Sequence, residues 1–413
     1  DRDIKYVDTL MSGIKLKRSI LNKSKCEDLS EGVYGVIRKR FDKLPRKQVL
    51  YYGKKHGVSE NALFIAAFNY CISMYSDEDE VFVNSIHSGR TDSRWNRIVG
   101  PLFETYYCKY DKVSHEKVEK LLKRTGKQIM ETMKCLTSCP RQGEMFLQFQ
   151  GDILETPQIG GENTERMHIQ LDSLPFHLQV MYDDNGYYTE LRFWENRFDK
   201  KLLEIFLDVF ESILLAMLDE TSVRCLKEHL PQEVYPKHYY VNVSKLNKAA
   251  GSKIISEEQS DEQIKVYVLD DDYSKKPYGA WGKVYIMDYE PINCAKIVQY
   301  PYGEGVLYDT GIIGRILPDG TIDFLENAGR TVLTDGIHGR KYYDLKLLEK
   351  YILEYGGVKD AECYLAYDPE INEMSLYADI KTDSAQIDIA GLKEFVRDKA
   401  GDDVFLKNVE IVQ

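Results

Sequence analysis

The chain lacks the features that mark membrane-spanning, secreted and zinc-binding proteins. No apolar run approaches the ~20 residues that a membrane-spanning helix needs, and the charged start DRDIKYVDTL is not a secretory signal. Among 8 Cys, the close pair Cys135 and Cys139 lacks CxxC spacing and has no second pair to complete a metal site. These absences predict a cytoplasmic protein with reduced, structural cysteines and no bound metal.

Basic residues are fewer than acidic ones, with 55 Lys/Arg against 67 Asp/Glu. The net charge of −12 excludes general nucleic-acid binding as a first interpretation. The first fifty residues are an exception, with 13 Lys/Arg against 7 Asp/Glu. Such a run is typical of a solvated surface, and a docking face for an acidic partner is the alternative.

Common catalytic signatures are missing as well. The sequence has no G-x-S-x-G, HExxH, EF-hand loop or P-loop, and none of its 8 His is next to another. Asp270-Asp271-Asp272 suggests either a cation site or, more simply, a solvated turn. The chain does not begin with Met, which is consistent with a fragment of a longer protein.

Regular hydrophobic patterns are present throughout the first half. Apolar residues at helical spacing predict helices at 58–75, at 114–135 and after Asp199, with Ser59 and Asp199 as N-caps. Period-two alternation predicts strands from residues 81, 101, 145, 176 and 187. Beyond residue 218 the sequence becomes polar. Short strands are predicted from residue 264, and a mixture of helices and strands is predicted after residue 330.

The order of these pieces in residues 1–222 resembles the carboxy-terminal half of a condensation domain from a nonribosomal peptide synthetase. HGVSENALFIAAFNYCISMYSDEDEVFVNSIHSGR is similar to the family's helix, turn and strand ending in Ser-Gly-Arg, and RIVGPLFETYYCKY is similar to its next segment. The family's acid/base motif, HHxxxDG, belongs to the other half of that domain. The resemblance therefore implies one wall of a cleft without its base.

Three residues at the end of one strand are candidates for that cleft: His87, Ser88 and Arg90. His87 is either a structural histidine or a catalytic one. Arg90 is predicted either to pair with a buried carboxylate or to face a tunnel that admits the phosphopantetheine arm of a carrier protein, where a cation meets the phosphate.

Residues 264–413 resemble the end of an adenylation (AMP-binding) domain from the same synthetases. VYVLDDDYSKKPYGAWGKVYI, VLYDTG, PDGTIDFL and IHGRKYYDLKLLEKYILEYGGVKDAECY follow the family's motifs in order. By that resemblance the degenerate nucleotide-site positions are Tyr308, Thr310, Gly311, Ile312 and Arg330. Ile312 stands where the family has the Asp that holds the ribose of ATP, and isoleucine cannot accept a hydrogen bond.

Other parts of a nucleotide site are missing, since no phosphate loop and no terminal NGK-type lysine is present. ATP and Mg²⁺ are therefore not expected, and no catalytic residue is assigned. We expect an α/β (α+β) protein. Its predicted parts are a chloramphenicol-acetyltransferase-like half-domain (1–222), a loop-rich linker (223–263), a remnant β-rich subdomain (264–330) and an α+β subdomain of the adenylate-forming fold (331–413).

The functional expectation is a truncated synthetase remnant, a pseudoenzyme from secondary metabolite biosynthesis. In the parent system such domains join carrier-bound aminoacyl thioesters through a peptide bond. One alternative is a non-enzymatic module that docks a carrier protein or other synthetase modules. A CoA-dependent acyltransferase ranks third. The sequence predicts neither a nucleic-acid nor a membrane partner.

Overall fold

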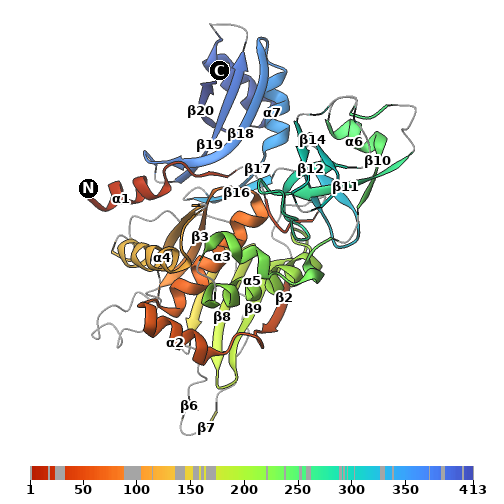
Figure 1. Ribbon diagram of the computed structural model, residues 1–413. Coiled ribbons are helices and arrows are strands. Elements are labelled where there is room, and N and C mark those ends of the chain that lie inside the picture. The colour runs from red at the N-terminus through yellow and green to blue at the C-terminus, as the bar shows by residue number, and fades with distance from the viewer. Residues whose placement is uncertain are drawn as a thin grey trace.

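The computed structural model is organised as three units around a central junction (Figure 1). The residues described are 2–16, 19–23, 33–87, 104–113, 115–134, 145–151, 158–159, 162–163, 174–219, 222–236, 239–250, 254–256, 262–287, 291, 294, 296–301, 303–325, 331–336, 339–371, 373–382, 387–401 and 404–412. Within them, no helix is both long and apolar enough to cross a membrane.

The first unit is a six-stranded sheet with helices on one face. The strand order is β2-β9-β8-β5-β3-β4, and the pairs β3/β5 and β5/β8 are parallel while the others are antiparallel. Its strands are β2 (Tyr34–Arg40), β3 (Glu80–His87), β4 (Glu104–Asp111), β5 (Met145–Gly151), β8 (Phe176–Asp183) and β9 (Gly186–Trp194), and a separate hairpin is β6 (Gln158–Ile159) with β7 (Glu162–Asn163). Its helices are α2 (Arg46–His56), α3 (Glu60–Ser76), α4 (Val118–Thr132) and α5 (Lys200–Asp219).

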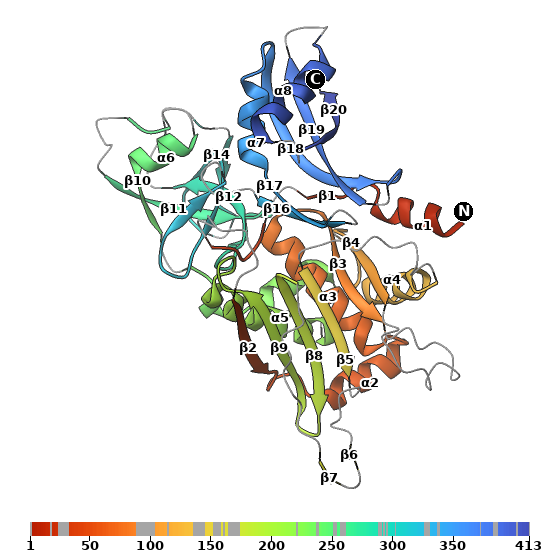
Figure 2. The same cartoon turned by 180° about the vertical axis from the view of Figure 1, so that it is seen from behind.

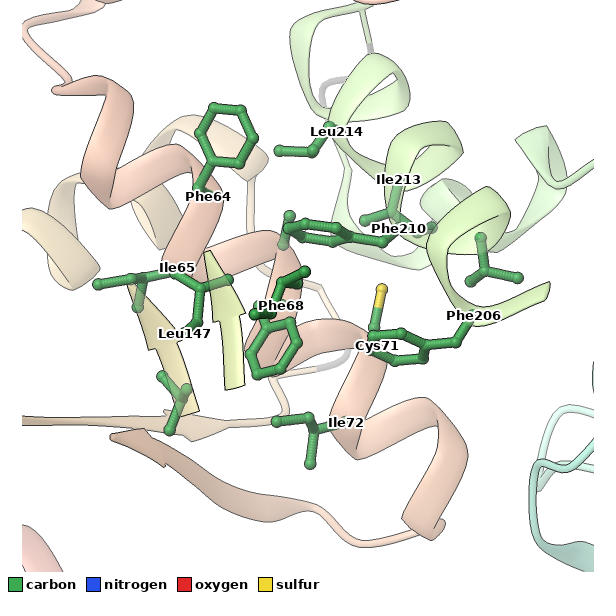
Figure 3. Close-up of a cluster of buried hydrophobic side chains, with 14 of the residues drawn as sticks. Phe64, Ile65, Phe68, Cys71, Ile72, Leu147, Phe206, Phe210, Ile213 and Leu214 are labelled. Carbon is green, nitrogen blue, oxygen red and sulfur yellow. The ribbon is translucent and has the colours of Figure 1, made fainter. Parts of the chain in front are cut away.

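The core of this unit lies between the sheet and helices α3 and α5. Phe64 and Phe68 of α3 pack against Phe206 and Phe210 of α5, and all four side chains are fully buried (Figure 3). Both helices begin where the sequence predicts. The side chain of Ser59 accepts a hydrogen bond from the backbone N–H of Ala62, as an N-cap does.

The second unit is a mostly antiparallel sheet that follows two short 3₁₀ helices, η3 (Val223–His229) and η4 (Gln232–Val234). The strand order is β10-β11-β12-β14-β13, and β15 pairs with β14. Its elements are β10 (Tyr240–Asn242), α6 (Val243–Ala250), β11 (Gln263–Leu269), β12 (Gly282–Ile286), β13 (Lys296–Gln299), β14 (Val306–Ile316) and β15 (Ile322–Phe324).

The third unit carries two helices on a four-stranded sheet of order β1-β18-β19-β20. The chain enters it through the hairpin of β16 (Thr331–Gly336) and β17 (Gly339–Asp344). The unit's later elements are α7 (Leu345–Leu353), β18 (Val358–Asp368), β19 (Glu373–Thr382), α8 (Ile389–Ala400) and β20 (Leu406–Ile411). The prediction of an α/β (α+β) protein is confirmed.

Two stretches lie with a different unit from the one that the sequence suggested. Helix α1 (Arg2–Met11) and strand β1 (Lys15–Leu16) precede the first unit, yet β1 pairs with β18 of the third. Within 223–263, which reads as a linker, β10 pairs with β11 and α6 buries Val243, Leu246 and Ala249. In both cases short apolar patterns gain their packing partners from distant parts of the chain.

Candidate functional site

Strand β14 carries four of the five residues that the sequence resemblance predicts as degenerate nucleotide-site positions, and it places them in the middle of the second sheet. Thr310 is 8% exposed, and its hydroxyl donates to the carbonyl oxygen of Val284 at 2.7 Å. The same hydroxyl oxygen accepts from the N–H of Ile312 at 3.3 Å. The Thr310 hydroxyl is therefore held by the backbone of its own strand and of β12.

Ile312 packs in the core of the second unit and is only 4% exposed. Its neighbours in that apolar cluster come from β11, β12 and β15 and include Val266, Val284 and Phe324. Tyr308 is half-buried against the same cluster. Because this position is filled by hydrocarbon and excludes water, it offers a ribose neither a hydrogen-bond acceptor nor space.

Gly311 has a backbone conformation that favours glycine, with φ of 72°. Its N–H donates to the carboxylate of Asp309 at 2.9 Å. The Thr-Gly pair of the motif thus serves a local kink within β14. Arg330, the fifth degenerate position, lies outside the described residues.

A different arginine, which sequence reasoning overlooked, occupies the centre of the molecule. Arg315 of β14 is fully buried, and its guanidinium donates to one carboxylate oxygen of Asp323 at 3.0 and 3.2 Å. It also donates to the side-chain oxygen of Asn22 at 3.0 Å and lies over the ring of Trp281, 4.6 Å from its centroid. Burial lowers the pKa of Arg315, and the Asp323 carboxylate opposes that shift.

The cleft candidates of the first unit are described only in part. His87 is the last residue of β3, and its backbone pairs with Glu104 of β4. Its side chain, together with Ser88 and Arg90, lies outside the described residues. Neither the structural nor the cleft interpretation of these three residues is tested.

Figure 2 views the strands of the first sheet from the side opposite helices α3 and α5. A second layer of side chains lies on this face of the sheet. Phe176, Leu178 and Val180 of β8 point to the helical core, so the alternate residues His177 and Gln179 point the other way. Strand pairing aligns further polar residues with these two across the sheet. We call this set the polar face: Arg38, Asn84, Gln148, His177, Gln179, Glu190 and Arg192.

Hydrogen bonds order part of the polar face. His177 Nε2 lies 3.0 Å from the side-chain oxygen of Gln148, which also accepts from the Gln179 amide at 3.2 Å. Glu190 accepts from Arg38 at 2.8 Å and from Arg192 at 2.8 and 3.0 Å. Burial acts to raise the pKa of Glu190, but the two arginines outweigh it and the pKa is lowered.

Two buried amide oxygens on the polar face have no hydrogen-bond partner within the described part of the chain. They are the side-chain oxygens of Asn84, 3% exposed, and Gln179, 5% exposed. A buried acceptor without a donor is costly, so such groups are usually paired. This face is therefore one place in the first unit where an added donor would be stabilised. The signal in the sequence was the polar alternation within the apolar strand FHLQVMYD.

A cavity of about 440 Å³ lies where the first and second units meet, between α3, η3 and the turn that follows β11. The Asp270-Asp271-Asp272 turn forms one wall. Lys227 bonds Asp270 at 2.6 Å and Asp272 at 3.1 Å, and Lys283 bonds Asp271 at 2.8 Å. Arg224 lies 3.5 Å from Asp272 as well, so three cations face the three carboxylates. No group of side chains suited to a metal ion occurs among the described residues.

The helix-covered sheet and the two units that follow it together have a fold that occurs in a nonribosomal peptide synthetase. A crystal structure of a four-domain nonribosomal peptide synthetase, bound to AMP and glycine, matches 100% of this chain at a TM-score of 0.61 and 10% sequence identity. The match covers 56% of that synthetase, so this chain spans about half of it. This likeness supports the fold class that the sequence predicts.

A sequence relative points to the same class. Over 106 residues the chain is 35% identical to surfactin synthase subunit 3 of Bacillus subtilis (strain 168). The aligned stretch covers 23% of this chain and 8% of that protein. No family model matches the chain. The synthetase relationship is therefore shown at the level of fold and of one segment.

Proposed function

We propose that this chain is a nonribosomal peptide synthetase remnant that does not activate amino acids by itself. In this proposal residues 264–413 derive from a truncated adenylation domain and residues 1–222 from half of a condensation domain. The observation that carries it is Ile312, whose side chain fills the core at the position where an adenylating enzyme would hold ribose. A site without that acceptor cannot orient ATP for attack.

Further support comes from what surrounds Ile312. Thr310 is bonded to Val284, and the nearby buried cation, Arg315, is bonded to Asp323 and Asn22. The Thr310 hydroxyl and the Arg315 guanidinium, two polar groups of β14, are therefore already bonded within the protein. Phosphate binding would have to break buried hydrogen bonds, which costs more than it returns.

The test is ATP–pyrophosphate exchange with a panel of amino acids, run beside an intact adenylating synthetase as positive control. We expect exchange at the no-enzyme background for every amino acid. Isothermal titration with Mg-ATP should show no saturable heat up to ~1 mM, the range of the weakest specific binding. Robust exchange with any amino acid contradicts the proposal.

A second candidate function is docking of a carrier protein or another synthetase module. The basic start of the chain gives this less support than the sequence suggested, because several of those charges are paired within the molecule: Arg38 with Glu190, Lys39 with Glu211, Arg40 with Asp183 and Arg46 with Glu60. The polar face supports docking better, because the side-chain oxygens of Asn84 and Gln179 accept no hydrogen bond from any described residue.

Titration with a phosphopantetheine-loaded carrier protein tests docking. We expect chemical-shift or heat changes by ~100 μM, as for weak transient contacts, and a weaker response from Gln179→Leu than from the wild type. Ile371→Gln, a change at a half-exposed position of the third unit, is the matched control. No response by ~100 μM, or equal responses from both variants, contradicts docking at the polar face.

A further inference from the structure

The first residues of the chain form one continuous apolar surface. Val7, Leu10, Met11 and Ile14 are buried, at 1%, 9%, 1% and 1% exposure. Val7, Leu10 and Met11 recur at the i, i+3 and i+4 spacing of one helical face, and Ile14 follows the end of the helix. Thr9, on the other side of α1, is exposed. A helix of ten residues is not stable alone in water, so its partners hold it in place.

Those partners come from two different units. The apolar cluster that contains Val7 and Met11 also contains Phe82 and Tyr107 from β3 and β4 of the first unit. It also contains Leu365 of β18 and further side chains of the third unit. Both views place α1 between the third unit and strands β3 and β4 (Figures 1 and 2).

Polar contacts follow the same division. On the third unit, the Tyr367 hydroxyl donates to Asp8 at 2.9 Å, and Lys15 donates to Asp379 at 2.9 Å. Strand β1 also extends that unit's sheet by pairing with β18. On the first unit, Lys109 of β4 donates to the carbonyl oxygen of Ser12 at 3.1 Å.

The following residues are anchored in the central junction. Ser19 and Asn22 are each 6% exposed, and Leu21 is fully buried. The indole N–H of Trp281, from the second unit, donates to the carbonyl oxygen of Ser19 at 3.1 Å. The carbonyl oxygen of Leu21 accepts from the N–H of Asp199 in the first unit at 3.2 Å.

We propose that residues 2–16 and 19–22 act as a strap that holds the third unit in one position against the first. The strap contacts all three units. Residues 19–22 are bonded in the central junction, and α1 and β1 pack against β18 and its neighbours. In this arrangement the position of the third unit is set by the seating of α1. Displacing α1 frees that unit to move while the first unit keeps its own core. The proposal is independent of any ATP or carrier binding.

The experiment compares Met11→Glu with Thr9→Glu in the full chain. Both add one negative charge to the same helix, but Met11 is buried and Thr9 is exposed. Hydrogen exchange is followed by mass spectrometry, with far-UV circular dichroism as a check on folding. We expect exchange in β18 and β4 to rise at least about tenfold in Met11→Glu alone, while α3 and α5 stay protected.

The milder Met11→Ala keeps the test decisive should Met11→Glu fail to fold, and it should raise exchange in β18 and β4 by a smaller factor. Small-angle X-ray scattering should show a larger radius of gyration for the whole protein in the Met11 variants, in which α1 is displaced, than in Thr9→Glu. Equal exchange in Met11→Glu and Thr9→Glu would overturn the proposal. So would a rise in α3 and α5 that matches the rise in β18, because α1 would then belong to a single global core.

Discussion

Replacing Ile312 by aspartate introduces the residue that the resemblance to adenylation domains predicts at this position, and it tests what the position does in this chain. The Ile312 side chain is 4% exposed and lies in the core shared by β11, β12, β14 and β15. Full burial of an isoleucine contributes about 1.5–3 kcal/mol. Aspartate forfeits that contribution and adds a carboxylate, whose removal from water costs several kcal/mol unless it takes up a proton.

The expected loss of unfolding free energy for Ile312→Asp is therefore above about 4 kcal/mol, against the ~5–15 kcal/mol that holds typical domains together. Two controls calibrate it. Ile312→Val removes one methylene and should cost about 0.5–1.5 kcal/mol. Ile297→Asp makes the same chemical change on the adjacent strand β13, where the side chain is 62% exposed, and should stay within ~0.5 kcal/mol.

Urea unfolding followed by circular dichroism measures these differences, and titration with Mg-ATP follows on each folded variant. We expect Ile312→Asp to unfold at markedly lower urea than Ile297→Asp and to bind no nucleotide. The reasoning is refuted if the two aspartate variants share one midpoint. It is also refuted if Ile312→Asp gains saturable ATP binding at wild-type stability, since position 312 would then face an open site.

Three further changes test the junction, the polar face and a helix cap. Asp323→Leu leaves the fully buried Arg315 without its carboxylate and should cost about 3–5 kcal/mol by urea unfolding, whereas the exchange of both partners, Arg315→Met with Asp323→Leu, should recover much of that loss. The pKa of Glu190 is lower in the folded protein than its unfolded value of about 4.5, so the ionised carboxylate stabilises the fold above pH 4.5 and this contribution is lost as the pH falls through the folded pKa. In Glu190→Gln the urea midpoint should therefore fall less steeply below pH 4.5 than in the wild type. An unchanged slope contradicts this. Asp199→Ala removes the acceptor for the Leu202 N–H, 3.0 Å away, and should cost about 1 kcal/mol at the start of α5.

Local patterns in the sequence predicted local structure well. Ser59 and Asp199 cap the helices that they were expected to cap, because a short polar side chain before an apolar period solves the problem of unpaired N–H groups within four residues. The strands of the first sheet likewise follow the alternation of their own residues. Such features depend on near neighbours, so the sequence contains all that they need.

The strap and the junction could not be predicted in this way. Val7, Leu10, Met11 and Ile14 do have helical spacing, but the pattern is short and stands in the charged start of the chain. Their burial depends on β18, more than three hundred residues away. The polar face is an intermediate case. Alternation reveals that His177 and Gln179 share a side of β8, while their alignment with Glu190 and Arg192 requires the strand order.

Strand β14 carries both the positions that we propose to be a degenerate nucleotide site and the contacts that join the three units. Its Thr-Gly-Ile segment is bonded to β12 and packed in the core, and three residues later Arg315 reaches Asn22 of the strap and Trp281 of the junction. The backbone N–H of Trp281 donates to the carbonyl oxygen of Tyr75 near the end of α3, and this hydrogen bond links the same junction to the first unit. A strand that must open to admit a nucleotide could not also hold three units by buried contacts. In our proposal, the bracing role of β14 and its inability to bind a nucleotide are therefore two consequences of one set of side chains.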